Sequence, residues 1–310
     1  MPRPRFYPHP SGGSKAGGAA EEPADEEGAK AAPAFGVHAV RVPRVICALG
    51  DLLLDVVVRL ESPIAEDTDT YGRTRVGAGG QAANVAAWVA ALGGRARLVG
   101  KRARDPIGRL VVEELERRDV DVVGPEVEYG TGTVVSIATA DGRRTMLSDR
   151  GVAPAFRLDE LDPSWLADCE RLHLPAYSLL TSPIRESALA AARLAPAVSV
   201  DLSSTAAIRA AGLAELQAVI GELGPDIVFA NEDEATLVGD LDVETLVVKR
   251  GARGCSVRRA GAETDHAAEA AEVVDSTGAG DAFAAGFLLG GPELALAAAT
   301  RCVAQMGAMP

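Results

Sequence analysis

The sequence predicts an α/β fold, a three-layer αβα sandwich in which helices cover both faces of a mainly parallel sheet. From Val42 onward, short β-branched or apolar runs alternate with Ala/Leu-rich stretches, as they do in βα repeats. Apolar residues make up 47% of the chain and charged residues 24%, which is typical of globular domains. Because no apolar run approaches the roughly 18 residues that span a bilayer, no membrane partner is expected.

Two sets of segments make up this alternation. The predicted strands are the short runs 44–49, 97–99, 171–174, 197–201, 227–230 and 245–249. The predicted helices are 81–92, 108–118, 183–194, 213–223, 281–289 and 292–306. Because helices alternate with the strands, the strands are expected to run parallel to one another.

Residues 1–40 differ in composition from the rest of the chain. Gly, Pro and Ala dominate them, and few apolar side chains are present to offset the loss of chain entropy, so a disordered extension is expected. They show neither the apolar segment of a secretory signal nor the acid-poor composition of a mitochondrial transit peptide. Residues 41–310 are predicted to form one domain.

Two segments, 56–76 and 131–147, interrupt the alternation. In the second, Asp141-Gly142 lies between two strand-like runs, which is a strong signal for a hairpin with a type I′ turn. A hairpin inserted here can form a small sheet over the end of the main sheet where open α/β folds bind ligands. These segments are therefore predicted to form a small β lid.

Charge and cysteine content limit the partners and the compartment. The chain has 31 Lys and Arg against 44 Asp and Glu, a net charge of −13 that would repel a phosphate backbone, so no nucleic-acid partner is expected. Its cysteines form no CxxC pair. Reduced thiols in a cytoplasmic protein are predicted.

The string DSTGAGDAF, residues 275–283, precedes a predicted helix. Gly278 and Gly280 free the backbone to point successive N–H groups into one concavity, and the helix N-terminus adds positive potential there. This pattern indicates an anion-binding hole. Asp281 by itself is most simply an acid that stabilises the helix dipole, but beside such a hole it can also accept the proton of an attacking hydroxyl.

A second string, GAGGQAAN at residues 77–84, leads into the helix predicted for 81–92. Its glycines let a small polar ligand approach the backbone, and Asn84 offers a donor and an acceptor, which suits hydroxyl groups. The string is also typical of an ordinary glycine turn, and it loosely fits the dinucleotide fingerprint of dehydrogenases. The residues before it do not resemble a buried strand, which argues against a dehydrogenase.

Other polar residues follow the predicted strands. Asp55 ends the string GDLLLD after the first strand, and Asn231 and Glu234 follow the strand 227–230, where an N-cap and a first-turn acid are also expected. Lys249 lies beside the two glycines of a G-x-x-G string, Gly251 and Gly254. Arg150 follows the hairpin and by itself is typical of a solvated surface charge.

At DSTGAGDAF the sequence resembles the ribokinase-like family of sugar and nucleoside kinases, also called the PfkB carbohydrate kinase family, whose signature reads D-T-x-G-A-G-D-x-F. GGQAAN resembles the family's G-G-x-x-x-N signature. The resemblance implies a ribokinase-like fold and the cofactors ATP and Mg²⁺. It also implies that Asp281 is the catalytic base and that Gly278, Ala279 and Gly280 supply backbone donors to the γ-phosphate.

The resemblance implies roles for the remaining motif residues as well. The substrate-binding residues it implies are Asp55, Gly79, Gly80, Asn84 and Arg150. The nucleotide-binding residues it implies are Asn231, Glu234, Lys249, Gly251 and Gly254. Asn231 and Glu234 would hold Mg²⁺ through water, and Asp275 and Thr277 would hold a monovalent cation such as K⁺.

Together these motifs predict an ATP-dependent kinase that transfers the γ-phosphoryl group to a hydroxyl of a small carbohydrate such as ribose, fructose or ketodeoxygluconate. A nucleoside acceptor is an alternative, for which the lid segments offer Tyr71 and Tyr129 as stacking partners. A non-catalytic protein that binds sugar and nucleotide is a more distant alternative. A homodimer formed through the lid is implied by the resemblance alone.

Overall fold

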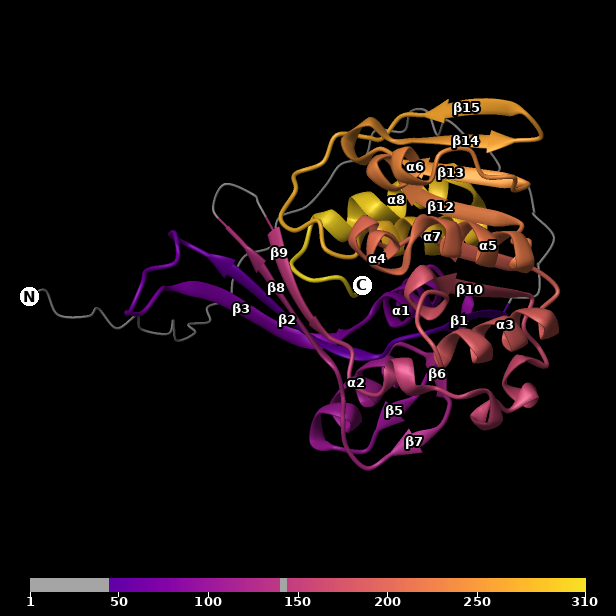
Figure 1. Cartoon of the computed structure of the whole chain (residues 1–310). Helices are drawn as coiled ribbons and strands as arrows, with labels where there is room; N and C mark the ends of the chain where they lie inside the picture. Colours follow the sequence, from indigo (N-terminus) through magenta and orange to yellow (C-terminus); the bar gives the residue numbers. More distant parts are fainter. Residues whose placement is uncertain (1–44, 140–143) are drawn as a thin grey trace, which may run out of the picture. The chain divides into compact units, whose positions relative to one another are not determined.

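A nine-stranded main sheet with the strand order β15-β14-β13-β12-β11-β10-β1-β4-β6 carries the fold (Figure 1). The structure, a computed structural model, describes residues 45–139 and 144–310. Neighbouring strands from β13 to β6 are parallel, and β14 and β15 add an antiparallel hairpin at one edge. The strands are β1 Val45–Leu49, β4 Arg95–Val99, β6 Val120–Val123, β10 Arg171–Pro175, β11 Val198–Asp201, β12 Ile227–Asn231, β13 Thr245–Lys249, β14 Cys255–Arg259 and β15 Ala262–His266.

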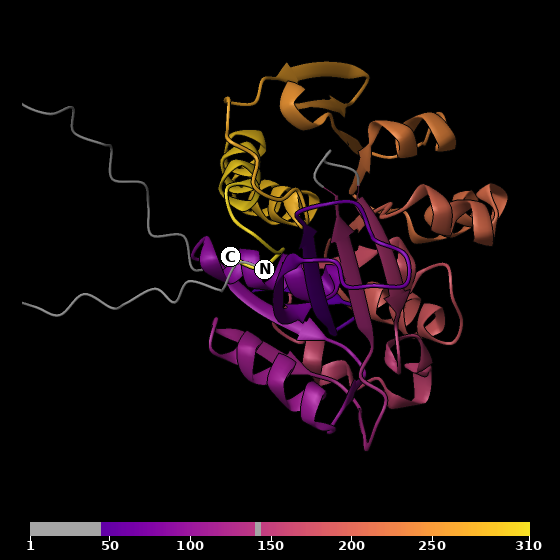
Figure 2. The ribbon, with the colours of Figure 1, turned by 90° about the vertical axis from the view of Figure 1, so that its left-hand side faces the viewer.

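Helices cover both faces of this sheet, as Figure 2 shows. One layer contains α1 Gln81–Ala91, α2 Pro106–Glu116, α7 Ala279–Gly290 and α8 Pro292–Val303. The other contains α3 Ile184–Leu194, α4 Thr205–Ala211, α5 Leu213–Leu223 and α6 Glu232–Val238. The predicted three-layer αβα fold with a mainly parallel sheet is confirmed.

The burial of β1 explains why its sequence is apolar throughout. Ile46 and Ala48 pack into the core beneath α1, α7 and α8, whereas Val45, Cys47 and Leu49 pack into the core beneath the helices of the other layer. A strand that is buried on both faces needs a continuous apolar run rather than an alternating one. Such runs were the signal from which the central strands were predicted.

The edge hairpin β14–β15 was not predicted. Strand β14 contains the charged residues Arg258 and Arg259, and β15 contains Glu263 and Asp265. Most of the β15 residues are exposed. Polar and charged side chains are typical of an edge strand, where one side of the strand has no neighbour. The hydrophobic signal of a central strand is therefore missing from this part of the sequence.

A second, four-stranded sheet, called the small sheet below, has the order β3-β2-β8-β9. Its strands are β2 Leu53–Leu60, β3 Gly72–Gly79, β8 Thr133–Ala138 and β9 Arg144–Asp149. Strand β2 pairs with β3 antiparallel and with β8 parallel, and β8 pairs with β9 antiparallel. The predicted turn at residues 141–142 and the predicted extension 1–40 lie outside the described residues. A two-stranded sheet of β5 Arg102–Ala103 and β7 Glu126–Val127 completes the strands.

The four cysteines, Cys47, Cys169, Cys255 and Cys302, are all buried and unpaired. Within residues 45–139 and 144–310, no helix is long and apolar enough to cross a membrane. The cytoplasmic location stays a prediction.

Candidate active site

A cavity of about 630 Å³ lies between the small sheet and the carboxyl ends of the main-sheet strands. It brings together residues that the sequence analysis took from separate strings: Asp55, Gly80, Asn84, Arg150, Asn231, Glu234, Lys249, Gly251, Thr277, Gly278, Gly280 and Asp281. Four further candidates are not among the residues that line this cavity: Gly79, Gly254, Asp275 and Ala279. Parallel strands place their carboxyl ends at one edge of a sheet, which is why strings so far apart in sequence meet there.

The backbone at the start of α7 forms one wall of the cavity. Gly278 is the N-cap of this helix and has a φ of 76°, a left-handed conformation that favours glycine. A Cβ at this position would lie 2.5 Å from the Cβ of Ala308. The glycine therefore lets the chain turn sharply into α7, so that the backbone N–H groups of its first turn can bind an anion.

Asn84 in α1 and Asp281 in α7 form a hydrogen bond between two helices that pack against each other. The Asn84 amide donates a 2.7 Å hydrogen bond from Nδ2 to Oδ2 of Asp281. The other amide atom of Asn84, Oδ1, is buried with no partner in the protein. Burial raises the pKa of Asp281 to about 7, which suits a general base that works near neutral pH.

The Asp55 carboxylate projects from β2 over the backbone of Gly79. A Cβ on Gly79 would lie 2.0 Å from the Asp55 carboxyl carbon, so glycine is required there. Gly80, with a φ of 96°, has the same need because a Cβ would lie 2.6 Å from the backbone oxygen of Asp51. Burial, reinforced by the negative charge of Asp275, raises the pKa of Asp55 to about 7.

Arg150 is not a solvated surface charge. Its guanidinium forms an ion pair with Asp51 and stacks 3.4 Å from the ring centroid of Tyr177. Both partners line the cavity with it. The sequence analysis missed Asp51 and Tyr177, although Asp51 stands in the string GDLLLD, because nothing in the sequence indicated that the segment after β9 returns to this string.

Lys249, at the end of β13, forms an ion pair with Asp201, which ends β11. The distance between Nζ and Oδ2 is 2.6 Å. The sequence analysis also missed Asp201, although its position at the end of a predicted strand was a usable signal.

Gly254 does not line the cavity. Glycine is needed there for close backbone packing, because a Cβ would lie 1.9 Å from the carbonyl oxygen of His266.

Asn231 and Glu234 form a capping box at the start of α6. The two oxygens of Glu234 accept hydrogen bonds of 2.8 Å from the backbone N–H and the side-chain amide of Asn231. The Asn231 side chain in turn accepts one from the N–H of Glu234. Because these atoms already bond one another, the pair fits an indirect contact with Mg²⁺ through water, as this metal retains much of its hydration shell.

Asp275 uses both carboxylate oxygens for bonds within the protein. Oδ1 accepts from the N–H and the hydroxyl of Thr277, at 2.9 and 2.7 Å, and Oδ2 accepts from the N–H of Gly307 at 2.9 Å. The carboxylate thus ties the string that precedes α7 to the C-terminal segment.

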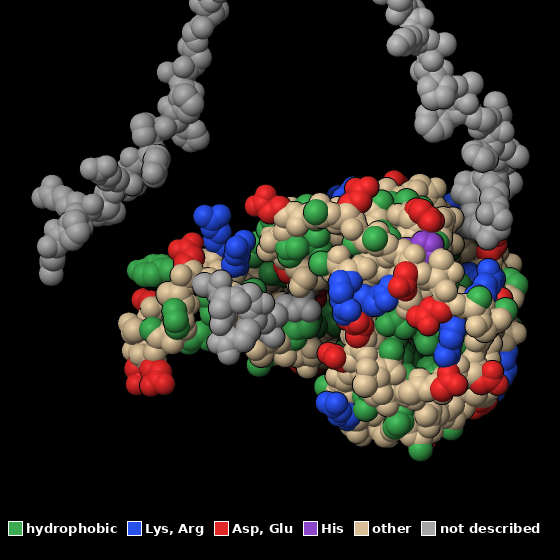
Figure 3. Space-filling model, turned by 90° about the horizontal axis from the view of Figure 1, so that it is seen from above, with side chains coloured by type: hydrophobic (Ala, Val, Ile, Leu, Met, Phe, Trp, Pro, Cys, Tyr) green, Lys and Arg blue, Asp and Glu red, His purple; other side chains and the backbone are tan. Residues whose placement is uncertain are grey.

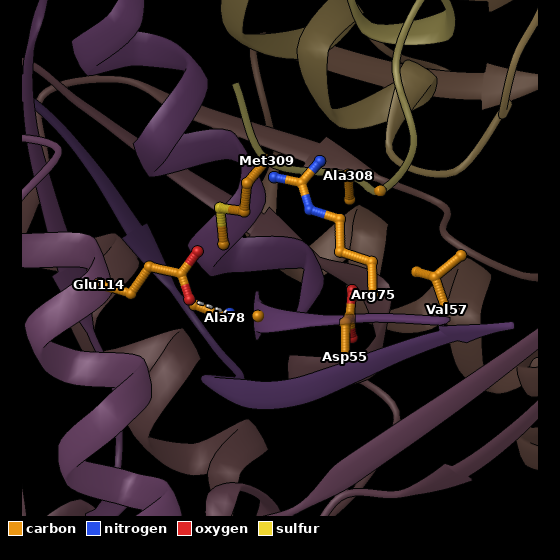
Figure 4. Close-up of a pocket in the computed structure, with 9 residues that line it drawn as sticks. Asp55, Val57, Arg75, Ala78, Glu114, Ala308 and Met309 are labelled. Carbon is orange, nitrogen blue, oxygen red and sulfur yellow. Dashed lines mark hydrogen bonds between the residues drawn. The ribbon is translucent and has the colours of Figure 1, made fainter. Parts of the chain in front are cut away.

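A smaller pocket of about 20 Å³ adjoins Asp55 (Figure 4). Arg75 reaches over it from β3 and donates to the carbonyl of Met306, while Glu114 accepts a 2.7 Å hydrogen bond from the N–H of Ala78. Met309 also lines it. This pocket has room for about one water molecule.

The dinucleotide fingerprint fails in its structural context. The string 77–84 begins inside β3, which pairs antiparallel with β2 in the small sheet, and continues into α1. A dinucleotide site needs the glycine turn directly after a parallel strand. The position of this string is therefore not that of a dinucleotide-binding turn.

Comparisons with known proteins identify relatives of this chain. The chain is 32% identical to the ATP-dependent ribose-1-phosphate kinase of Halopiger xanaduensis, over 84% of this chain and 90% of that protein. It is 29% identical to a fructokinase of Salmonella typhimurium, over 78% and 83%. Among solved structures, the adenosine kinase from Sinorhizobium meliloti has the same fold, with a TM-score of 0.78 at 24% identity, over 87% of this chain and 96% of that one.

The sequence pattern described as pfkB family carbohydrate kinase matches residues 44–308, nearly the whole of the described chain. This match confirms the predicted family and the predicted enzyme class, a carbohydrate kinase. The chain belongs to the pfkB family of carbohydrate kinases.

Proposed function

We propose that the protein is an ATP-dependent sugar kinase that transfers the γ-phosphoryl group of ATP to a hydroxyl of a small neutral carbohydrate. The observation that carries this proposal is the position of Asp281, which is bonded to Asn84 and lies in one cavity with Gly278 and Asp55. A base, an anion hole and a hydroxyl-binding carboxylate in one cavity are the parts that phosphoryl transfer to an alcohol requires. A relative that is named an ATP-dependent kinase supports the choice of nucleotide.

In this mechanism Asp281 accepts the proton of the acceptor hydroxyl. The hydroxyl oxygen forms a bond to the γ-phosphorus while the bond from that phosphorus to the β–γ bridging oxygen breaks, and ADP leaves. Asn84 holds the carboxylate in place, and the backbone N–H groups from Gly278 to Gly280 stabilise the charge on the transferring group. With a pKa of about 7, Asp281 can take up the proton and release it again near neutral pH.

The proposed cofactors include Mg²⁺, which supplies charge neutralisation to the phosphates when it is bound. Asn231 and Glu234 would hold its waters, as their mutual hydrogen bonds suggest. A monovalent cation such as K⁺ at Asp275 and Thr277 stays a prediction. Both carboxylate oxygens of Asp275 already accept backbone hydrogen bonds, so these bonds give no support for a cation at this place.

The charges at the acceptor end of the cavity favour a neutral acceptor. Within the described part of the chain, neither Asp55 nor Asp281 forms an ion pair with a lysine or arginine, and the charge of Arg150 is balanced by Asp51. Arg75 lies outside this cavity and donates to a backbone carbonyl. A sugar acid or sugar phosphate would bring its negative charge close to the carboxylates of Asp55 and Asp281, which is costly at low effective dielectric.

A nucleoside acceptor has less support. Tyr71 and Tyr129 are each 77% exposed and do not line the cavity, and Arg150 covers the ring of Tyr177. Among the described cavity residues, Tyr177 is the only aromatic one, and Arg150 occupies one face of its ring, which leaves limited aromatic surface for a base to stack on.

We also propose that the small sheet acts as a lid and that two copies of the chain associate through it. Figure 3 shows hydrophobic side chains on this projecting sheet, where Val76 and Leu147 are 55% and 56% exposed. Exposed apolar side chains grouped in this way are typical of an interaction surface. Light scattering should give twice the mass of one chain, and Leu147→Lys should restore the monomer; an unmodified chain that is monomeric would contradict the dimer.

An ADP-release assay with ATP and Mg²⁺ tests the proposed function. The acceptors to compare are ribose, fructose, ketodeoxygluconate, ribose 1-phosphate and adenosine, each against a blank without acceptor. We expect turnover with a neutral sugar. Turnover with ribose 1-phosphate or ketodeoxygluconate alone would overturn the neutral acceptor, turnover with adenosine alone would favour the nucleoside kinase, and no turnover with any acceptor in a broadened panel would favour a binding protein.

A further inference from the structure

The phosphate end of the cavity contains a buried ion pair that the mechanism above does not use. Lys249 ends β13 and Asp201 ends β11, and their side chains meet across the end of β12, with Nζ 2.6 Å from Oδ2. The side chain of Asp201 is 1% exposed and that of Lys249 is 15% exposed. Both residues line the cavity, so the pair borders the site where the phosphates of ATP are proposed to bind.

The turn that follows β11 fixes the Asp201 carboxylate. Its second oxygen, Oδ1, accepts a 3.0 Å hydrogen bond from the N–H of Ser203. Ser203 has a φ of 68°, an unfavourable left-handed conformation for a residue other than glycine, and its hydroxyl is held by the N–H of Ala176 at 3.0 Å. Backbone strain of this kind persists where the surroundings impose it, often at functional sites. The carboxylate therefore presents Oδ2 to Lys249 in one orientation.

The ammonium of Lys249 lies against the first turn of α7. A Cβ placed on Gly280 would lie 3.2 Å from Nζ, closer than nearly all real contacts of a Cβ. Gly280 directly precedes Asp281, so the ammonium is next to the wall that would face the transferring phosphoryl group. An ammonium has three N–H donors, so it can bond to Asp201 and to a phosphoryl oxygen at the same time.

We propose that Asp201 is a positioning residue that holds the Lys249 ammonium beside the transferring phosphoryl group, and that position 280 is glycine because it makes room for that ammonium. This inference rests on the proposed function. It gives Gly280 a second role besides the backbone donor implied by the family resemblance, and it assigns a role to Asp201, which no motif indicated.

The charges around Lys249 support this role. Burial opposes its positive charge, but the carboxylates of Asp201 and Glu234 outweigh that effect and raise the pKa of Lys249, and Asp281 adds to the same direction. The side chain is therefore a cation throughout the neutral range. A cation held in a dry site in advance stabilises developing negative charge without the cost of reorganising at the moment of reaction.

A double-mutant cycle tests the inference on the full chain with the best neutral sugar. We expect Lys249→Met to lower kcat about 100-fold, as the loss of a preorganised charge does, and Asp201→Asn to lower it about tenfold through misplacement of the ammonium. In the Lys249→Met background, Asp201→Asn should have almost no further effect, and KM for the sugar should stay unchanged in all variants. Equal effects of Asp201→Asn in both backgrounds, or an unchanged kcat in Lys249→Met, would overturn the inference.

Gly280→Ala provides an independent measurement if Asp201→Asn fails to fold. Its Cβ should displace the ammonium and lower kcat, but it should cost little more once Lys249 is already methionine. A drop of the same size in both backgrounds would assign the loss to the backbone and contradict the proposed role of Gly280.

The ion pair Lys101–Glu160 offers a matched control. It is also a lysine–carboxylate pair with 2.6 Å between Nζ and Oε1, with 7% and 21% of the two side chains exposed, and it lies outside the cavity. Glu160→Gln should lower Tm and leave kcat unchanged, which separates loss of a buried pair from loss of a positioned cation. If the unmodified chain turns over no acceptor, the proposed function fails; if it turns over and the cycle is additive, this inference fails alone.

Discussion

The two ends of the cavity satisfy their polar groups in different ways. At the phosphate end, side chains bond to one another: Lys249 to Asp201, and Asn231 to Glu234. At the acceptor end, Arg150 pairs with Asp51 and Asn84 bonds to Asp281, but the amide oxygen of Asn84 is buried without a protein partner. Buried polar atoms are nearly always satisfied, so this oxygen is a candidate contact for a ligand in the cavity.

The two ends also come from different parts of the fold. The phosphate end is formed by the buried strands of the main sheet and by α7, whereas Asp55 and Met146 at the acceptor end belong to the small sheet. Met146 is 48% exposed, in contrast to the fully buried core beneath α7. Under the proposed function, the chemistry would depend on a rigid scaffold, while acceptor selectivity would depend on a more exposed element that can vary without disturbing the proposed base.

The largest expected effect comes from the base. Asp281→Asn should lower kcat about 1000-fold, because the amide cannot accept the hydroxyl proton, while KM for ATP changes little. Steady-state rates with ATP and the best sugar measure this. Asp159→Asn is the matched control, since Asp159 is an exposed acid paired with Arg157, and it should leave the rate unchanged. A comparable loss in both variants would remove Asp281 from its proposed role.

The turn into α7 at the phosphate end should also be sensitive to backbone changes. The alanine in Gly278→Ala would have to adopt a left-handed φ and would place its Cβ 2.5 Å from that of Ala308. We expect kcat to fall about 100-fold because the anion hole is displaced. We also expect a lower Tm. Gly221→Ala, in α5 with nothing within 4 Å of its Cβ, should keep kcat and raise the stability by up to about 1 kcal/mol through helix propensity. Steady-state rates and thermal melts of Gly278→Ala and Gly221→Ala measure these differences. Equal kcat values in the two variants would mean that the turn into α7 is not part of the site.

At the acceptor end, Asp55→Asn should affect binding more than turnover. We expect KM for the sugar to rise about 10- to 100-fold, because hydrogen bonds between a carboxylate and hydroxyl groups are lost, whereas KM for ATP should stay the same. Substrate titrations of both ligands measure this split. A rise in KM for ATP of the same size would show that the two ends do not act separately.

The pH dependence of kcat/KM in Asp55→Asn further distinguishes the roles of Asp55 and Asp281. Burial raises the pKa of both Asp281 and Asp55 to about 7, and both act as carboxylates. The value of kcat/KM should therefore rise with increasing pH and level off above about 7. On the acidic side, a plot of log kcat/KM against pH should have a slope near two for the unmodified chain and near one for Asp55→Asn. A slope of one in both proteins would show that Asp55 does not need to be ionised.

The smallest expected effect lies at the base of the small sheet. Asp105, the N-cap of α2, accepts hydrogen bonds from the backbone of Gly108, Gly130 and Thr131 and from the Thr131 hydroxyl, just before β8 begins. These bonds, opposed by burial, lower its pKa to about 2. Asp105→Asn should lower the urea midpoint and raise KM for the sugar only a few-fold, because the entry to the small sheet loosens.

The stabilisation from Asp105 should depend on pH in a defined direction. A lowered folded-state pKa means that the carboxylate contributes fully above its unfolded pKa of about 4, and that this contribution is lost as the pH falls toward 2. The difference in urea midpoint between the unmodified chain and Asp105→Asn should therefore shrink between pH 5 and pH 2. Asp162→Asn, which removes a carboxylate that caps a short helix outside the site, should leave KM unchanged at every pH.

The sequence by itself determined the fold class and the elements that carry the site. Apolar runs between helical stretches predicted the central strands within two residues of their observed ends. Glycines next to a helix start predicted that the backbone around Gly278 forms one wall of the cavity. Glycine marks this place because the backbone at Gly278 adopts a conformation that other residues rarely adopt. Such features are local, and local residue types are enough to specify them.

Only the tertiary structure decided which side chains meet. Asp201 and Lys249 belong to strands that are separated by β12, and Asn84 reaches Asp281 although the two residues are 197 positions apart in the sequence. Such contacts depend on strand order, on register and on the packing of one helix against another, and no short string encodes these. The residues near the reacting groups could therefore be named from the sequence, whereas the ion pair that orients Lys249 became visible only when the strands lay side by side.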